Sequence, residues 1–231
     1  MILKAAVARK TERDLDMTSF AFPNAYLETD VPPRSWPWTG ILSLVSLAGL
    51  SCFGLSVLFL HLAPTGYDPI RQAVSDYAVG PFGVFMAIGF FGGGVGVAAL
   101  GVALLLAASP SRAFNVGTAL VLVAGISLFL VGLFPTDLEG SATTFHGMVH
   151  SVLSQVVFSL GPIGMLLISF CYGKRWFGVS ILIYAVTGAF LAVNLALSLG
   201  QTGIAERFFI LFLLCWWLTA SIQAFRGRLP A

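Results

Sequence analysis

Residues 81–107 read PFGVFMAIGFFGGGVGVAALGVALLLA, a continuous run without a single Asp, Glu, Lys, Arg or His. A helix needs about 20 apolar residues to cross the hydrocarbon core of a bilayer. The whole chain has the same character: of its 231 residues, 58% are hydrophobic and 10% are charged, and the mean hydropathy is +0.93. Soluble domains carry about 25% charged residues. The sequence therefore predicts an all-α protein that is embedded in a membrane.

Similar apolar runs lie on both sides of this stretch and predict a bundle of six transmembrane helices. The loops at 109–112 and 173–175 are very short, so the helices that they join should be antiparallel neighbours. We expect a transmembrane domain over 36–228, after a cytoplasmic and largely disordered tail at 1–35. The predicted spans are 38–62, 81–107, 113–134, 145–171, 176–199 and 206–225.

Lysine and arginine are distributed very unevenly between the two sides of the predicted bundle. Ten lie in the tail, in the two short loops and at the C-terminus, whereas two, Arg71 and Arg207, lie on the other side. Because cytoplasmic loops are enriched in Lys and Arg, both termini should be cytoplasmic in a plasma (inner) membrane. The net charge of +2 and the lack of a basic run argue against a nucleic-acid partner.

The first long loop on the opposite side contains a helix-start signal. Asp68 followed by Pro69 is typical of an N-cap and a first helical residue. The apolar residues after it recur with helical spacing, which predicts a short amphipathic helix lying on the outer surface. Arg71 can pair with Asp68 across one turn. Ser75 and Asp76 follow on the same segment.

Two histidines share one face at the start of the fourth span. His146 and His150 are one turn apart, about 6 Å along the helix axis, and Ser154 continues the stripe. Such a pair suits a metal ion such as zinc if His61 supplies a third ligand and Asp137, Asp76 or water the fourth. A hydrogen-bonded network in a packed outer vestibule is the favoured interpretation of the pair, and haem ligation is a third.

Further polar residues lie at the same depth in the last two spans. Asn194 is near the outer end of span five, and Glu206 and Arg207 open span six. We expect Arg207 to pair with Asp76 or Asp137, and Glu206 with Arg71. Because lipid-facing positions would be costly for these groups, they should line a shared, outward-facing pocket. Its candidate residues are Asp68, Arg71, Ser75, Asp76, Asp137, Ser154, Asn194, Glu206 and Arg207.

Glycines of the second span are spaced for helix packing rather than for chemistry. Gly89 with Gly93, and Gly92 with Gly96, form small-xxx-small pairs, which allow helices to approach closely in lipid. The cysteines lack a CxxC spacing, so we interpret them as small apolar residues.

Three features together resemble the family of domain-of-unknown-function 998. They are the segment from Tyr67-Asp68-Pro69 to Ser75-Asp76, the Phe134-Pro135 turn that leads to His146-Gly147 and His150, and the Gly203-x-x-Glu206-Arg207 opening of a last span with Trp216 and Trp217. The resemblance covers roughly residues 38–226. It implies a bacterial or archaeal integral membrane protein of about six helices, and it implies no established activity.

Two function classes fit these observations best. One is a module that binds a lipid or small molecule, or that assembles with membrane partners as a homo- or hetero-oligomer. The alternative is a metal-dependent membrane hydrolase that acts on a lipid-like substrate at the outer leaflet, where His-bound zinc would activate water. A transporter is less favoured, because the spans lack mid-membrane charges, repeats and broken helices. Membrane lipids are expected partners in every case.

Overall fold

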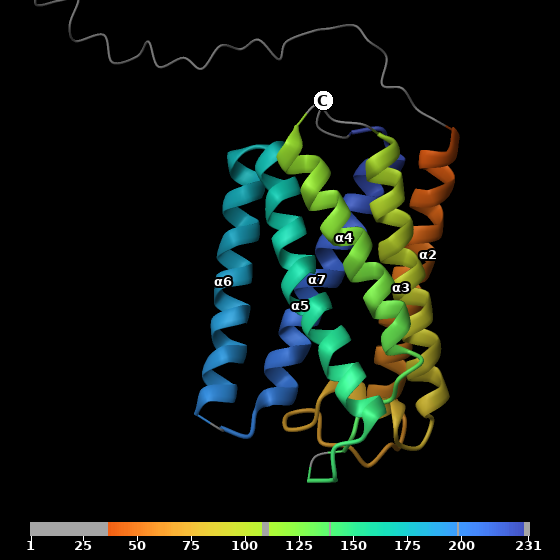
Figure 1. Cartoon of the computed structure of the whole chain (residues 1–231), viewed down its shortest axis with the longest axis vertical. Coiled ribbons are helices and arrows are strands. Elements are labelled where there is room, and N and C mark those ends of the chain that lie inside the picture. Colours follow the sequence, from red (N-terminus) through yellow and green to blue (C-terminus); the bar gives the residue numbers. More distant parts are fainter. Residues whose placement is uncertain (1–36, 108–110, 139, 198, 229–231) are drawn as a thin grey trace, which may run out of the picture. The chain divides into compact units, whose positions relative to one another are not determined.

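The computed structural model describes residues 37–107, 111–138, 140–197 and 199–228 (Figure 1). Within these ranges it contains six helices that are long and apolar enough to cross a membrane, and no strand. The all-α, six-helix prediction is therefore confirmed. The predicted tail at 1–35 lies outside the described residues, as does Glu139.

The helix boundaries agree with the predicted spans to within a few residues. The largest difference is at the last helix, which begins at Thr202 rather than at 206. It extends further because the loop that joins the first two spans supplies carbonyl acceptors for the N–H groups of Gly203 and Ile204. The elements are α2 (Pro37–Leu62), the 3₁₀ helix η2 (Val74–Ala78), α3 (Gly83–Leu106), α4 (Arg112–Val131), α5 (Phe145–Tyr172), α6 (Lys174–Ala196) and α7 (Thr202–Phe225).

The two ends of the bundle differ in their side chains. At one end, called here the basic end, lie Arg112, Lys174, Arg175 and Arg226, at the termini of α4, α6 and α7. The opposite end, called the polar end, contains the connections at 63–82, 132–144 and 197–201 and is at the bottom of Figure 1.

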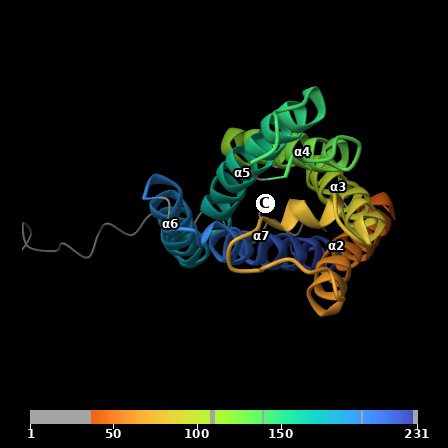
Figure 2. The ribbon, with the colours of Figure 1, turned by 90° about the horizontal axis from the view of Figure 1, so that it is seen from below.

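Helices that follow one another in sequence pack side by side from α2 to α5, and α7 returns to pack against α2. Helix α6 packs against α5 and α7, and both ribbon views place it on the far side of the bundle from α2 (Figures 1 and 2). Most of its residues remain exposed on the surface of the chain.

Glycines bring neighbouring helices into backbone contact. A Cβ added at Gly49 of α2 would collide with the backbone of Gly92 and Gly96 on α3. Gly117 of α4 and Gly164 of α5 would each collide with the other's carbonyl oxygen. The predicted packing role of the α3 glycines is thus confirmed, because small residues let helices approach closely in lipid.

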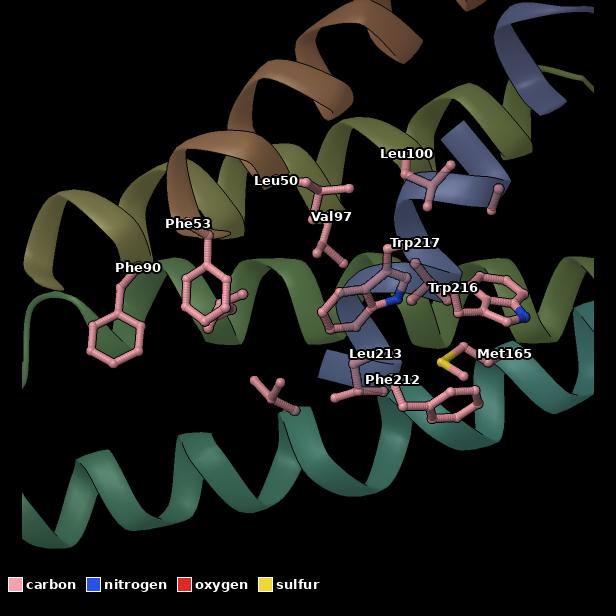
Figure 3. Close-up of a cluster of buried hydrophobic side chains, with 14 of the residues drawn as sticks. Leu50, Phe53, Phe90, Val97, Leu100, Met165, Phe212, Leu213, Trp216 and Trp217 are labelled. Atoms are coloured by element: carbon pink, nitrogen blue, oxygen red, sulfur yellow. The ribbon is translucent and has the colours of Figure 1, made fainter. Parts of the chain in front are cut away.

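The interior is filled by large apolar side chains from α2, α3, α4, α5 and α7, some of which are labelled in Figure 3. Phe53 of α2 lies next to Phe90 of α3, with ring centroids 6.3 Å apart. Nearer the basic end, Trp216 donates a hydrogen bond to Ser169 at 3.0 Å. Such contacts hold α7 against its neighbours, because packing and interhelical hydrogen bonds drive helix association in a bilayer.

The short helix between the first two spans differs in place and type from the expected one. It is a 3₁₀ helix that begins at Val74, not a helix that starts at Pro69. It does not lie flat on the surface, since Val74, Asp76 and Tyr77 are buried. Asp68 instead accepts a hydrogen bond from the N–H of Ile70 at 2.9 Å, which stabilises a turn. Tertiary contacts to α7 outweigh the local helix signal here.

Candidate functional site

The loop that joins α2 to α3 crosses the start of α7, then turns as η2 into the space between α3 and α7 (Figure 2). The N–H of Gly203 donates to the carbonyl of Arg71 at 3.2 Å, and that of Ile204 to the carbonyl of Ile70 at 3.0 Å. The first N–H groups of a helix lack partners within it, so the loop acts as the cap of α7. Gly203 is required here, because a Cβ would collide with the backbone of Gln72.

Arg207 fixes the same loop from one turn further along α7. Its Nε donates to Nε2 of His61 at 2.7 Å, and its Nη1 donates to the carbonyls of Gln72 at 2.7 Å and Gly203 at 2.9 Å. Nη2 donates to the hydroxyl of Tyr77 at 3.3 Å. None of these acceptors is a carboxylate. The guanidinium is thus well hydrogen-bonded, but by neutral groups.

The hydrogen bonds of His61 define its tautomer. Nδ1 lies 2.7 Å from the carbonyl oxygen of Val57, which can only accept, so Nδ1 carries a proton. Nε2 accepts from Arg207, so it carries none. His61 is therefore a neutral ring with both nitrogens in use. A metal could bind Nε2 only if Arg207 moved away.

Glu206 lies beside Arg207 in the chain but faces a different side of α7. Its side chain is 9% exposed, and Oε2 accepts a hydrogen bond from the N–H of Val74 at 3.0 Å. This bond ties the carboxyl group to the first residue of η2. Asp76 is also buried, and its Oδ2 accepts from the N–H of Ala73 at 3.1 Å.

His150 is buried on α5, with 3% of its surface exposed. Its Nδ1 donates to the carbonyl of Phe134 at 2.7 Å. In the neutral ring, Nε2 is then an acceptor. The bond also joins α5 to the segment that follows α4, so His150 both orders the polar end and offers a ring nitrogen to the interior.

Asp137 caps the start of α5. Its carboxylate accepts hydrogen bonds from the N–H of Thr144 at 2.8 Å and from the Thr144 hydroxyl at 2.7 Å. The Thr144 hydroxyl in turn accepts from the N–H of Gly147 at 3.1 Å. The hydrogen bonds from Thr144 hold the pKa of Asp137 below its ordinary value. Asp137 is therefore part of a helix cap.

Four of the predicted residues come together around one small space between the helices, called here the central cavity. Ser75 of η2, His150 and Ser154 of α5, and Glu206 of α7 all line it, and its volume is about 40 Å³. The rest of the wall is mainly apolar and includes Phe53, Val74, Phe90, Leu128, Val131, Val157, Phe158, Ile210 and Leu213.

Trp217 is a residue of the central cavity that the sequence interpretation missed. It lines the cavity, and its buried Nε1 has no hydrogen-bond partner among the described residues. Its position could have been inferred, because Glu206, Ile210, Leu213 and Trp217 recur every three or four residues and share one face of α7.

The other predicted site residues lie elsewhere. Asp68 and Arg71 form the predicted ion pair across one turn, exposed and 3.7 Å long, whereas the other expected partner of Arg71, Glu206, bonds to the N–H of Val74 instead. His146 is exposed on α5, against the rings of Phe134 and Phe145. Asn194 is buried on α6, where its Nδ2 donates to the carbonyl of Phe190 at 2.9 Å.

The predicted zinc ligands do not form a metal site in the described part of the chain. The described residues include no group of three or more His, Cys, Asp or Glu placed to hold a metal ion. The three histidines have separate surroundings instead: Arg207 for His61, two phenylalanine rings for His146, and the Phe134 carbonyl for His150.

A second space, called here the lateral groove, runs between α2 and α7 and has a volume of about 290 Å³. His61 and Arg207 are the charged or polar residues that line the groove, and its walls are otherwise apolar. Phe53, Val74 and Ile210 line both the groove and the central cavity, so these side chains form the wall between them.

A family model described as Protein of unknown function (DUF998) matches residues 46–223. The chain belongs to this family. Neither the comparison with curated proteins nor that with solved structures found a match. The match contains every residue that lines the central cavity and the lateral groove, so both belong to the part of the chain that defines a DUF998 protein. Its six apolar helices make this DUF998 member a multi-pass membrane protein.

Proposed function

We propose that this protein is a membrane-embedded binding module whose ligand is a small polar molecule held in the central cavity. The observation that supports this most is the convergence of Ser75, His150, Ser154 and Glu206 on one small, mostly apolar space. Small-molecule sites commonly combine apolar walls with a few convergent polar groups.

The chemistry of the wall suggests the class of ligand. The carboxyl group of Glu206 and Nε2 of a neutral His150 are acceptors, and the two serine hydroxyls can donate or accept. A ligand with N–H donors, such as a small amine or its ammonium form, would match this set. A water molecule needs about 10–15 Å³ of such space, so the cavity has room for about three water-sized groups.

The cover of the site is η2. It contributes Val74 and Ser75 to the wall, and its first N–H is held by Glu206, so a ligand that bonds to Glu206 also affects the contact that holds η2.

A titration with methylammonium, and with formamide as the neutral comparison, tests the proposal by thermal unfolding of the purified protein. We expect methylammonium to stabilise the wild type more than formamide does.

Three variants test whether methylammonium binds in the central cavity. Ser154→Val should abolish the stabilisation by filling the cavity. Ser151→Val, on the exposed side of the same helix, is the matched control and should retain it. Glu206→Gln keeps an acceptor for Val74 and should weaken methylammonium binding about tenfold, a change of about 1.4 kcal/mol. Equal responses of Ser154→Val and Ser151→Val would contradict the proposal.

We further propose that the polar end faces outward and that both termini are cytoplasmic. The support is the charge distribution: Arg112, Lys174, Arg175 and Arg226 lie at the basic end, and cytoplasmic loops are enriched in such residues.

The zinc-dependent hydrolase remains a weaker proposal. It would need His61 to exchange its bond with Arg207 for a metal and His150 to join it from the other side of the wall between groove and cavity. Metal analysis of the purified protein tests it directly.

A further inference from the structure

We propose that the lateral groove binds an anionic phospholipid, with its phosphate beside Arg207 and His61 and one acyl chain between α2 and α7. This site is separate from the central cavity, since Arg207 and Glu206 are neighbours on a helix and such residues point about 100° apart. Glu206 lines the cavity, whereas Arg207 lines the groove.

The apolar part of the groove suits a lipid chain. Its walls include Val57, Leu58, Leu211 and Leu214. Leu58 and Leu211 are each 55% exposed on the surface of the chain, so the groove opens sideways toward the bilayer rather than into the bundle. From Arg207 to Leu214 is a rise of about 10 Å at 1.5 Å per residue. The hydrocarbon part of one leaflet is about 15 Å deep, so the groove spans most of it.

The charge at the polar end of the groove favours an anionic headgroup. The hydrogen-bond acceptors of Arg207 are an imidazole nitrogen, two carbonyls and a phenol, none of which carries a negative charge. These four bonds use four of its five N–H groups, so one N–H of Nη2 is left to donate. Guanidinium groups bind phosphate strongly, so an interfacial phosphate would be attracted to this group.

The groove is also preformed. Arg207 is held by Gln72 and Tyr77 on the loop side, and His61 is oriented by the Val57 carbonyl. Because these side chains are already ordered, a headgroup would bind without the cost of immobilising them.

The test uses the full-length protein in detergent, titrated with phosphatidylglycerol, phosphatidylcholine or inorganic phosphate, with thermal stability and bound lipid as readouts. We expect phosphatidylglycerol to bind about tenfold more tightly than phosphatidylcholine, a difference of about 1.4 kcal/mol. Inorganic phosphate should have no comparable effect, because it lacks the chain that fills the groove.

Two variants locate the site without altering Arg207, whose loss could unfold the loop. Leu58→Trp fills the groove and should lower phosphatidylglycerol affinity at least tenfold. Leu182→Trp is the matched control, since Leu182 is 63% exposed on α6, away from the groove, and this variant should bind phosphatidylglycerol like the wild type.

Three results would each overturn the proposal: equal affinity for both lipids, an equal effect of inorganic phosphate, or unchanged phosphatidylglycerol binding by Leu58→Trp. Dissociation of a dimer by Leu58→Trp, without any lipid effect, would assign the groove to a second copy of the chain and also overturn it.

Discussion

At the scale of single residues, the three histidines show how one residue type takes three roles at the same end of a bundle. His61 is a neutral acceptor for Arg207, His150 is a buried donor to the Phe134 carbonyl, and His146 lies exposed against aromatic rings. Their spacing in sequence suggested one metal centre. His61 meets Arg207 of α7, and His150 meets the Phe134 carbonyl before α5, and helical spacing alone cannot reveal these contacts.

His146 and His150 should therefore respond differently to substitution. His150→Ala leaves the Phe134 carbonyl without its donor, and we expect a loss of about 1–3 kcal/mol of stability. His146→Ala, the matched exposed variant, should change stability by about 0.5 kcal/mol or less. Thermal unfolding and zinc content of each purified variant are the measurements. Stoichiometric zinc that disappears in both variants, without a loss of stability, would instead establish the pair as metal ligands.

Asp137 should make stability depend on acid. Its pKa is lowered by the hydrogen bonds from Thr144, so the folded protein binds the proton more weakly than the unfolded chain does, whose Asp pKa is about 3.9. The stabilisation is complete above that value and is lost as the pH falls through the lower, folded pKa. Asp137→Asn keeps an acceptor but cannot titrate. Thermal unfolding from neutral to strongly acidic pH should show a steeper loss for the wild type; parallel curves would contradict this role.

At the scale of elements, the start of α7 and the loop at 63–82 form one unit. The loop supplies carbonyls to the N–H groups of Gly203 and Ile204, and α7 supplies Glu206 and Arg207 to the loop backbone. This exchange explains why α7 begins at Thr202 and why η2 is buried rather than lying on the surface.

Gly203→Ala tests this unit. The added Cβ would collide with the backbone of Gln72, and overpacking of this kind costs about 1–3 kcal/mol. Gly178→Ala on α6 is the control, since nothing lies within 4 Å of its added Cβ. It should be neutral or stabilising by up to about 1 kcal/mol, because Ala is the better helix former. Thermal unfolding compares the two, and limited proteolysis of Gly203→Ala should show earlier cleavage between α2 and α3. Equal stability of the two variants would show that the loop does not need this close contact.

At the scale of the whole molecule, the two ends of the bundle carry different chemistry. The basic end holds the cations at the termini of α4, α6 and α7, whereas the three histidines and the polar residues of the cavity and the groove lie toward the polar end. This asymmetry is what the proposed orientation rests on, because positive charge is retained on the cytoplasmic side during insertion.

Single cysteines can test the orientation in intact cells. Cys52, Cys171 and Cys215 would first be replaced by Ala, and Ser141→Cys or Arg228→Cys then added; both positions are exposed. An impermeant thiol reagent should label Ser141→Cys and not Arg228→Cys. Labelling of Arg228→Cys but not of Ser141→Cys would show that the orientation is opposite to the proposed one. Permeabilised cells, in which both cysteines should react, are the control.

The sequence alone determined the fold class, the number of spans and most of their ends, because bilayer thickness and the cost of burying charge in hydrocarbon act on every local stretch. It also proposed one pocket of nine polar residues beside the three histidines; of these twelve residues, Ser75, Ser154, Glu206 and His150 line the central cavity. Only the tertiary structure decided that His61 pairs with Arg207, that Trp217 joins the cavity, and that η2 begins at Val74. The reason is that these features depend on backbone groups and side chains far apart in sequence. Hydrophobic periodicity reports which face of a helix is buried, not which residue of another helix it meets.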